Sequence, residues 1–209
     1  MIAFTQLKKL SGAVALVAAS VSCGDAVRQG KSPVYLVIDQ LTGAPGGASN
    51  AAGTGNNFLH SDVLTMVTSP APCTTTAPCP TVFADSGAVK LRSLQKDVTA
   101  TSPSTNSEVT INRYHVTYRR ADGHNTPGVD VPYGFDGALT GTTSGGVVTL
   151  NFELVRNVAK METPLADLAT NPAVITTIAE VTFYGRDMVG NDMSVSGSIQ
   201  IDFGNFGDK

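Results

Sequence analysis

The last long patterned stretch of the sequence, Ala179–Phe203, decides the fold and reads AEVTFYGRDMVGNDMSVSGSIQIDF. On each side of a polar turn, apolar residues alternate with polar ones. This is the period of a β-strand that has one buried face and one solvent-exposed face. Two such runs joined by Gly, Asn and Asp predict an antiparallel hairpin. The positions expected to face the core are Ala179, Val181, Phe183, Met193, Val195, Ile199, Ile201 and Phe203.

The same alternation recurs upstream, over residues 146–155 (GVVTLNFELV) and residues 108–120 (EVTINRYHVTYRR). In the second run the apolar positions change phase, which predicts a β-bulge near Asn112 and Arg113. No stretch shows helical periodicity over three turns. Further strands are expected over residues 33–41, where one helical turn beginning at Ser32 is the alternative, and over residues 61–68, 88–94 and 132–140, the last with Tyr133, Phe135 and Leu139 on one side.

Many alternating strands, Gly/Pro/Asn-rich turns and the absence of helical periodicity predict an all-β fold. We expect an antiparallel β-sandwich with long Gly/Pro/Thr-rich loops. It would form a single domain over residues 33–209. Within that domain, residues 33–100 could be irregular and residues 107–205 regular.

The N-terminal residues carry the three parts of a bacterial export signal. Two lysines precede an apolar run over residues 10–19, and small residues 20–22 follow it. The apolar run is shorter than the ~20 residues that a bilayer-spanning helix needs. The sequence therefore predicts a signal peptide over residues 1–22, followed by a polar tether over residues 23–32.

Residues 21–24 (VSCG) resemble the lipobox of bacterial lipoproteins, in which the signal is cut just before a cysteine that then receives acyl chains. This resemblance implies that Cys23 is a lipid-attachment residue and that the protein is exported to the cell envelope. It would be an outer-membrane or periplasm-facing lipoprotein. Ser20 stands where the family usually has Leu or another large aliphatic residue. Ordinary cleavage after Ser20, which would give a secreted protein, is the alternative.

The other two cysteines, Cys73 and Cys79, lie close together in PAPCTTTAPCP. An exported protein meets an oxidising compartment, so the pair is interpreted as a disulfide that closes a small loop. A metal site is the other interpretation, but two cysteines without nearby histidines make a poor zinc site. A disulfide between them leaves Cys23 unpaired, as lipidation requires.

Residues 185–192 (GRDMVGND) resemble the final hairpin of bacterial immunoglobulin-like and fibronectin-III-like modules, where D-x-x-G-N precedes a serine- and threonine-rich last strand. The resemblance covers the C-terminal half of the chain. It implies an immunoglobulin-like β-sandwich that serves as a non-catalytic module of an envelope or secreted protein.

No residue is assigned a catalytic role, and no enzyme is predicted. His60, Ser61 and Asp62 are sequential, so neighbouring side chains on a strand point to opposite faces and cannot form a triad. His115 and His124 lie in a strand and a loop without partners of catalytic spacing. The sequence contains no HExxH, GxSxG, CxxC or phosphate-binding motif.

The acidic loops raise the possibility of calcium, which prefers oxygen ligands. The candidate ligands are Asp122, Asp130, Asp136, Asp187 and Asp192. Asp and Asn also hydrogen-bond their own turns, and no DxDxDG loop is present, so the turn interpretation is favoured. No metal and no cofactor are predicted.

A formal net charge of −3 provides no basic face for nucleic acid. The combined interpretation is a lipid-anchored cell-envelope protein with a structural or interaction role. Its expected partners are the membrane, through the lipid, and another envelope protein or a glycan. The alternative is a glycan- or Ca²⁺-binding β-sandwich module of a secreted or envelope protein.

Overall fold

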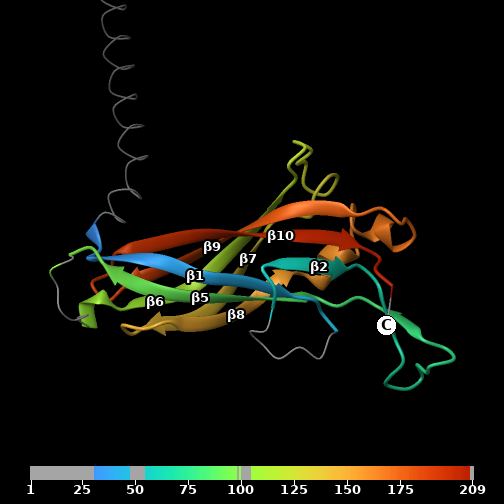
Figure 1. Ribbon diagram of the computed structural model, residues 1–209, viewed down its shortest axis with the longest axis horizontal. Helices are drawn as coiled ribbons and strands as arrows, with labels where there is room; N and C mark the ends of the chain where they lie inside the picture. The colour runs from blue at the N-terminus through green and yellow to red at the C-terminus, as the bar shows by residue number, and fades with distance from the viewer. Residues whose placement is uncertain (1–30, 48–54, 98, 100–104, 208–209) are drawn as a thin grey trace, which may run out of the picture.

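The computed structural model of the protein describes residues 31–47, 55–97, 99 and 105–207 (Figure 1). The predicted signal peptide, Cys23 and all but the last two residues of the predicted tether lie outside these residues. Short helical turns occur at η1 (Thr105–Ser107), α3 (Asn157–Lys160) and η2 (Ala166–Ala169). The strands are β1 (Val34–Ala44), β2 (Phe58–Asp62), β3 (Thr65–Val67), β4 (Cys79–Thr81), β5 (Asp85–Gln95), β6 (Val109–Arg119), β7 (Phe135–Thr143), β8 (Val148–Val155), β9 (Ile175–Asp187) and β10 (Asp192–Gly204).

The strands form a five-stranded sheet in the order β2-β10-β9-β6-β7, a three-stranded sheet in the order β1-β5-β8, and the β3-β4 ribbon. The all-β prediction is therefore confirmed. The expectation of purely antiparallel pairing is wrong at one place, because β2 pairs with β10 in parallel. Parallel pairing is possible here since β2 and β10 are far apart in the sequence, so no tight turn has to join them.

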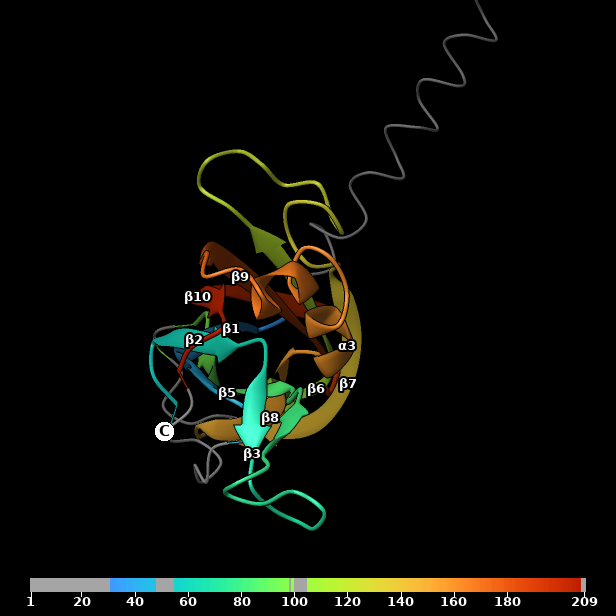
Figure 2. The same ribbon diagram turned by 90° about the vertical axis from the view of Figure 1, so that its right-hand side faces the viewer.

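The two sheets share one apolar core, and the five-stranded sheet is curled into half of a barrel around it (Figure 2). The predicted inward positions of the β9–β10 hairpin are all buried except Val195, which is half-buried. Where β1 approaches β10, a Cβ on Gly197 would lie 2.8 Å from Ile38 Cδ1. Only glycine lets the two strands come this close without a shift.

Two tyrosines on β6 join the two sheets by hydrogen bonds to the backbone of β8. The Tyr118 hydroxyl donates to the Leu154 carbonyl at 2.7 Å, and the Glu153 N–H donates to the Tyr114 hydroxyl oxygen at 3.2 Å. Burial raises the pKa of Tyr118, so its hydroxyl keeps its proton and remains a donor. These bonds satisfy backbone groups of β8, which pairs with β5 within its sheet.

The predicted bulge is confirmed by a register shift between Ile111 and Arg113. The single strand predicted over residues 61–68 is wrong, because an Asp62 side chain accepts the Leu64 N–H and turns the chain between β2 and β3. Tyr133 does not share the inward face of β7. It precedes that strand and is 58% exposed.

Among the described residues, no helix has both the length and the apolar character that a membrane crossing would need.

The tight packing of Tyr114 over Gly137 predicts that Gly137→Ala lowers the free energy of unfolding by about 1–3 kcal/mol. The new Cβ would lie 2.2 Å from Tyr114 Cζ, and the ring cannot easily move because it also packs on Phe135, Phe152 and Phe183. Urea denaturation measures the change. Gly146→Ala is the control, since a Cβ there meets nothing within 4 Å. Equal stabilities of the two variants would contradict the packing argument.

Candidate functional site

A buried ion pair between Asp85 and Lys160 is the most unusual polar feature of the described residues. Lys160 Nζ lies 2.9 Å from Oδ1 and 2.9 Å from Oδ2 of Asp85. The Asp85 side chain is 0% exposed and the Lys160 side chain is 1% exposed. Charged groups are almost never fully buried unless they are paired, so this pair needs a physical account.

The alternation of side chains along β5 places Asp85 inside, beside a shift in the register with β8 between Asp85 and Ser86. Asp85 is the first residue of β5, and its side chain falls on the same inward face as Val89 and Leu91. Lys160 is the last residue of α3, the single helical turn that follows β8. The chain therefore brings a carboxylate and an ammonium together from positions 75 residues apart.

Three more groups complete the hydrogen bonding of the pair. Ser61 Oγ donates to Asp85 Oδ2 at 2.6 Å, and the Gly46 N–H donates to Oδ1 at 2.7 Å. Lys160 Nζ also donates to the Asp62 carbonyl oxygen at 2.8 Å. Within the described part of the chain, no buried side-chain nitrogen or oxygen lacks a partner. The network therefore links the chain after β1, the end of β2, the start of β5 and α3.

Burial raises the pKa of the Asp85 carboxyl above its ordinary value, while the Lys160 ammonium and the Ser61 and Gly46 hydrogen bonds act in the opposite direction. The Ser61 hydroxyl is 0% exposed and is directed at the carboxylate. The geometry of this network suits a structural link between chain segments better than it suits an exposed nucleophile.

Sequence reasoning did not find this site. Asp85 looks like a turn residue in front of a strand, and a four-residue helix is too short to reveal its inward position by periodicity. Ser61 was considered only beside its neighbours His60 and Asp62. It points inward while His60 is exposed, so the three do not converge, as expected from the strand geometry.

Each histidine lies beside one aspartate, and the three pairs are in different parts of the fold. The separations from histidine Nδ1 to the carboxylate oxygen are 3.6 Å for His60–Asp202, 3.1 Å for His115–Asp136 and 3.5 Å for His124–Asp122.

The acidic candidates in the loop between β6 and β7 bond to their own loop. Asp122 accepts from the Arg120 side chain and from the His124 N–H, and the Arg120 bond is the main cause of its lowered pKa. Asp130 accepts the Thr126 N–H at 3.0 Å, which lowers its pKa.

The acidic candidates of the β9–β10 turn behave in the same way. Asp187 accepts from the N–H groups of Val189 and Asn191 and from the Asn191 side chain. Partial burial acts to raise the pKa of Asp187, but the hydrogen bonds from Asn191, Ser32 and Val189 together lower the pKa below its ordinary value. Asp192 pairs with Arg186 at 2.7 Å. Across the described ranges, no three His, Cys, Asp or Glu residues lie together so that they could hold a metal ion.

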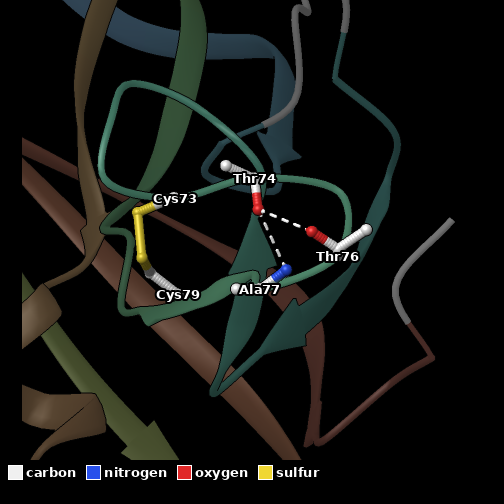
Figure 3. The surroundings of a disulfide bond; sticks show 5 residues. All are labelled: Cys73, Thr74, Thr76, Ala77 and Cys79. Atoms are coloured by element: carbon white, nitrogen blue, oxygen red, sulfur yellow. Dashed lines mark hydrogen bonds between the residues drawn. A yellow bond between two sulfur atoms is a disulfide. The ribbon is translucent and has the colours of Figure 1, made fainter.

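Cys73, in the loop that connects β3 and β4, and Cys79, the first residue of β4, form the predicted disulfide (Figure 3). Inside it, paired backbone hydrogen bonds join Thr74 and Ala77, and Thr74 Oγ1 also accepts the Ala77 N–H at 3.0 Å. Residues 74–78 are exposed. This loop projects from the body of the protein (Figure 2), so the disulfide fixes the shape of a presented loop.

Comparisons with protein-family models, with curated protein sequences and with solved structures find no match for this chain.

Removing the buried cation tests the ion pair. We expect Lys160→Met to lower the free energy of unfolding at neutral pH by about 3–5 kcal/mol, because it leaves an uncompensated carboxylate in the core. The loss should be smaller below pH 3.8, the ordinary pKa of an aspartate, where Asp85 is protonated in the folded and unfolded chains alike. As the pH rises above this value, the unfolded chain ionises first and the variant loses stability. Urea denaturation across this pH range measures the difference from the wild type.

Two controls make this test specific. Asp85→Asn/Lys160→Met removes both charges but keeps an acceptor for Ser61, so it should be more stable than Lys160→Met alone and show no widening gap with pH. Arg92→Met breaks the exposed Arg92–Asp39 pair and should cost at most about 1 kcal/mol. If Lys160→Met lowered the free energy of unfolding as little as Arg92→Met does, the buried pair would not be a stabilising link between chain segments.

The disulfide should pin its loop rather than hold the fold, because it joins residues only six positions apart. We expect Cys73→Ser/Cys79→Ser to lower the free energy of unfolding by no more than about 2 kcal/mol. Faster hydrogen exchange should be confined to the loop between β3 and β4. Exchange that also accelerates in β9 and β10 would contradict a local role.

Proposed function

We propose that this chain is an exported protein held in the bacterial cell envelope by a lipid on Cys23, and that its β domain has a non-catalytic structural or interaction role. The observation that carries the proposal is the distribution of cysteines. Cys73 and Cys79 are consumed by their disulfide, so Cys23 is the one cysteine left over in the sequence. It stands directly after a sequence with the pattern of an export signal, where lipidation requires a free thiol.

The way the chain enters the domain supports an anchor on the N-terminal side. Ser32 is 2% exposed, and its hydroxyl donates to Met193 Sδ at 3.3 Å just before β1 begins. The N-terminal segment therefore joins the domain at a defined point, at one end of the domain. At ~3.3–3.6 Å per extended residue, the stretch from Cys23 to Ser32 spans at most about 30 Å.

The opposite end of the domain supplies the surface for an interaction role. The disulfide-containing loop extends from that end, and residues 120–134, which follow the far end of β6, project to the opposite side of the molecule from this loop (Figure 2). A protein anchored through its N-terminal side would present these loops away from the membrane, toward another envelope protein. Loops held on a rigid sheet scaffold are common sites of recognition.

The finer fold assignment is also a proposal: an immunoglobulin-like sandwich. Its support is the two-sheet core and the β9–β10 hairpin, whose turn is closed by Asp187 and Asn191 at the positions that suggested the resemblance.

Intact-mass measurement of the protein purified from its envelope tests the anchor. We expect a chain that begins at Cys23 and carries the mass of acyl chains, and that is two hydrogens lighter than the reduced chain because of the disulfide. Cys23→Ser should remove the acyl mass and move the protein from the membrane fraction to the soluble fraction. Cys73→Ser/Cys79→Ser is the control and should keep the acyl mass. An unmodified wild-type chain that begins at Val21 would contradict the lipoprotein assignment.

A further inference from the structure

The end of the domain that receives the N-terminal chain carries exposed apolar side chains. Met188 and Val189, at the tip of the β9–β10 turn, are 61% and 63% exposed. Tyr35 and Leu94 face each other on β1 and β5 and are 59% and 39% exposed. Val147, in the turn before β8, is 56% exposed. We call this set of five residues, together with the turns that bear them, the tether end.

Strand register places these residues at one end of the molecule. The first residue of β1 pairs with the last residue of β5, so Tyr35 and Leu94 lie where the chain enters. Val109, the first residue of β6, pairs with both Asp187 and Thr143, which brings the β9–β10 turn and the β7–β8 turn to that same end. Figure 1 shows β1 beginning at this end, away from β2 and the C-terminus.

The side chains of the two residues at the tip of the β9–β10 turn do not form the turn. Asp187, Gly190 and Asn191 make it: Asp187 accepts the neighbouring N–H groups, and Gly190 takes the positive φ of +97°. Turn tips are normally polar, because apolar side chains there remain in water. Met188 and Val189 depart from this rule side by side, which indicates that something other than water meets them.

We propose that the tether end rests on the lipid bilayer, with Met188 and Val189 inserted at the boundary between headgroups and acyl chains. This inference rests on the proposed lipid anchor. A tether of at most about 30 Å keeps the domain at the surface, so even weak apolar contacts act at a high effective concentration. The anchor joins the domain at the end that carries these side chains, so the bilayer is the first apolar phase they can reach.

The remaining side chains of the tether end suit an interface of this kind. Tyr35 has an apolar ring with a polar tip, the type of side chain enriched where membranes meet water. The Lys96 ammonium lies 4.8 Å from the centre of that ring. Lys31 adds another cation, while Asp97 and Glu108 carry the opposite charge. Because these charges are mixed, the contact depends on apolar burial rather than on anionic lipids.

The absence of tryptophan from the chain allows a direct test. Met188→Trp and Val189→Trp each place a single fluorophore on the tether end. Val129→Trp is the matched control, because Val129 is 67% exposed but lies in the loop between β6 and β7 at the opposite end. Circular dichroism checks that each variant folds. The chain from Cys23 is coupled through that thiol to a maleimide lipid in phosphatidylcholine vesicles, with and without brominated acyl chains.

We expect the fluorescence of Met188→Trp and Val189→Trp to shift to the blue on coupling and to be quenched by the brominated chains, while Val129→Trp shows neither change. Adding anionic lipid should leave the quenching unaltered. Equal, weak quenching at all three positions would overturn the inference. Chemical coupling makes the result independent of lipidation in the cell. A failure here therefore leaves the proposed anchor intact, and failure of the intact-mass test leaves this experiment interpretable.

Discussion

The ion pair between Asp85 and Lys160 is the constraint that holds together the chain segments around the start of β5. Backbone pairing holds each sheet together, but it does not join the start of β5 to α3 or to the end of β2. The pair and its Ser61, Gly46 and Asp62 partners make that connection. A buried carboxylate loses its hydration, so the network tolerates it only because both of its oxygens accept hydrogen bonds from the surrounding groups. A shift of one segment would leave a charge without a partner, so the four segments are held in register.

The neighbouring contact between β6 and β8 uses neutral groups for the same purpose. Tyr114 and Tyr118 lie on one face of β6, and both hydroxyls reach the backbone of β8. Tyr114 and Tyr118 are 4% and 5% exposed, respectively, so their rings fill the core while their hydroxyl groups hydrogen-bond the backbone of a strand. Aromatic residues with one hydrogen-bonding group are well suited to the contact between two sheets.

Whether the sequence predicted a feature depends on how far apart in the chain the interacting residues lie. Alternation is local, so the inward residues of β9 and β10 and the bulge at Asn112 and Arg113 could be identified from neighbouring positions. The Asp85–Lys160 pair and the parallel pairing of β2 could not, because each joins segments far apart in the chain that have no distinguishing local pattern. Tyr133 was misplaced for a related reason, since the alternation in the sequence begins before the first residue of the strand.

The two ends of the strands bear different loops, and this difference gives the domain a direction. The tether end has tight turns that carry Met188, Val189 and Val147. The opposite end has the disulfide-containing loop and residues 120–134, whose aspartates accept hydrogen bonds from their own loop. β9 and β10 each run for 13 residues, which at ~3.4 Å per residue separates the two ends by about 40 Å. With the tether end on a bilayer, the long loops would stand about that far above the lipid. Under the proposed anchoring, a partner would meet the loops, and the sheets would act as a rigid spacer between that partner and the membrane.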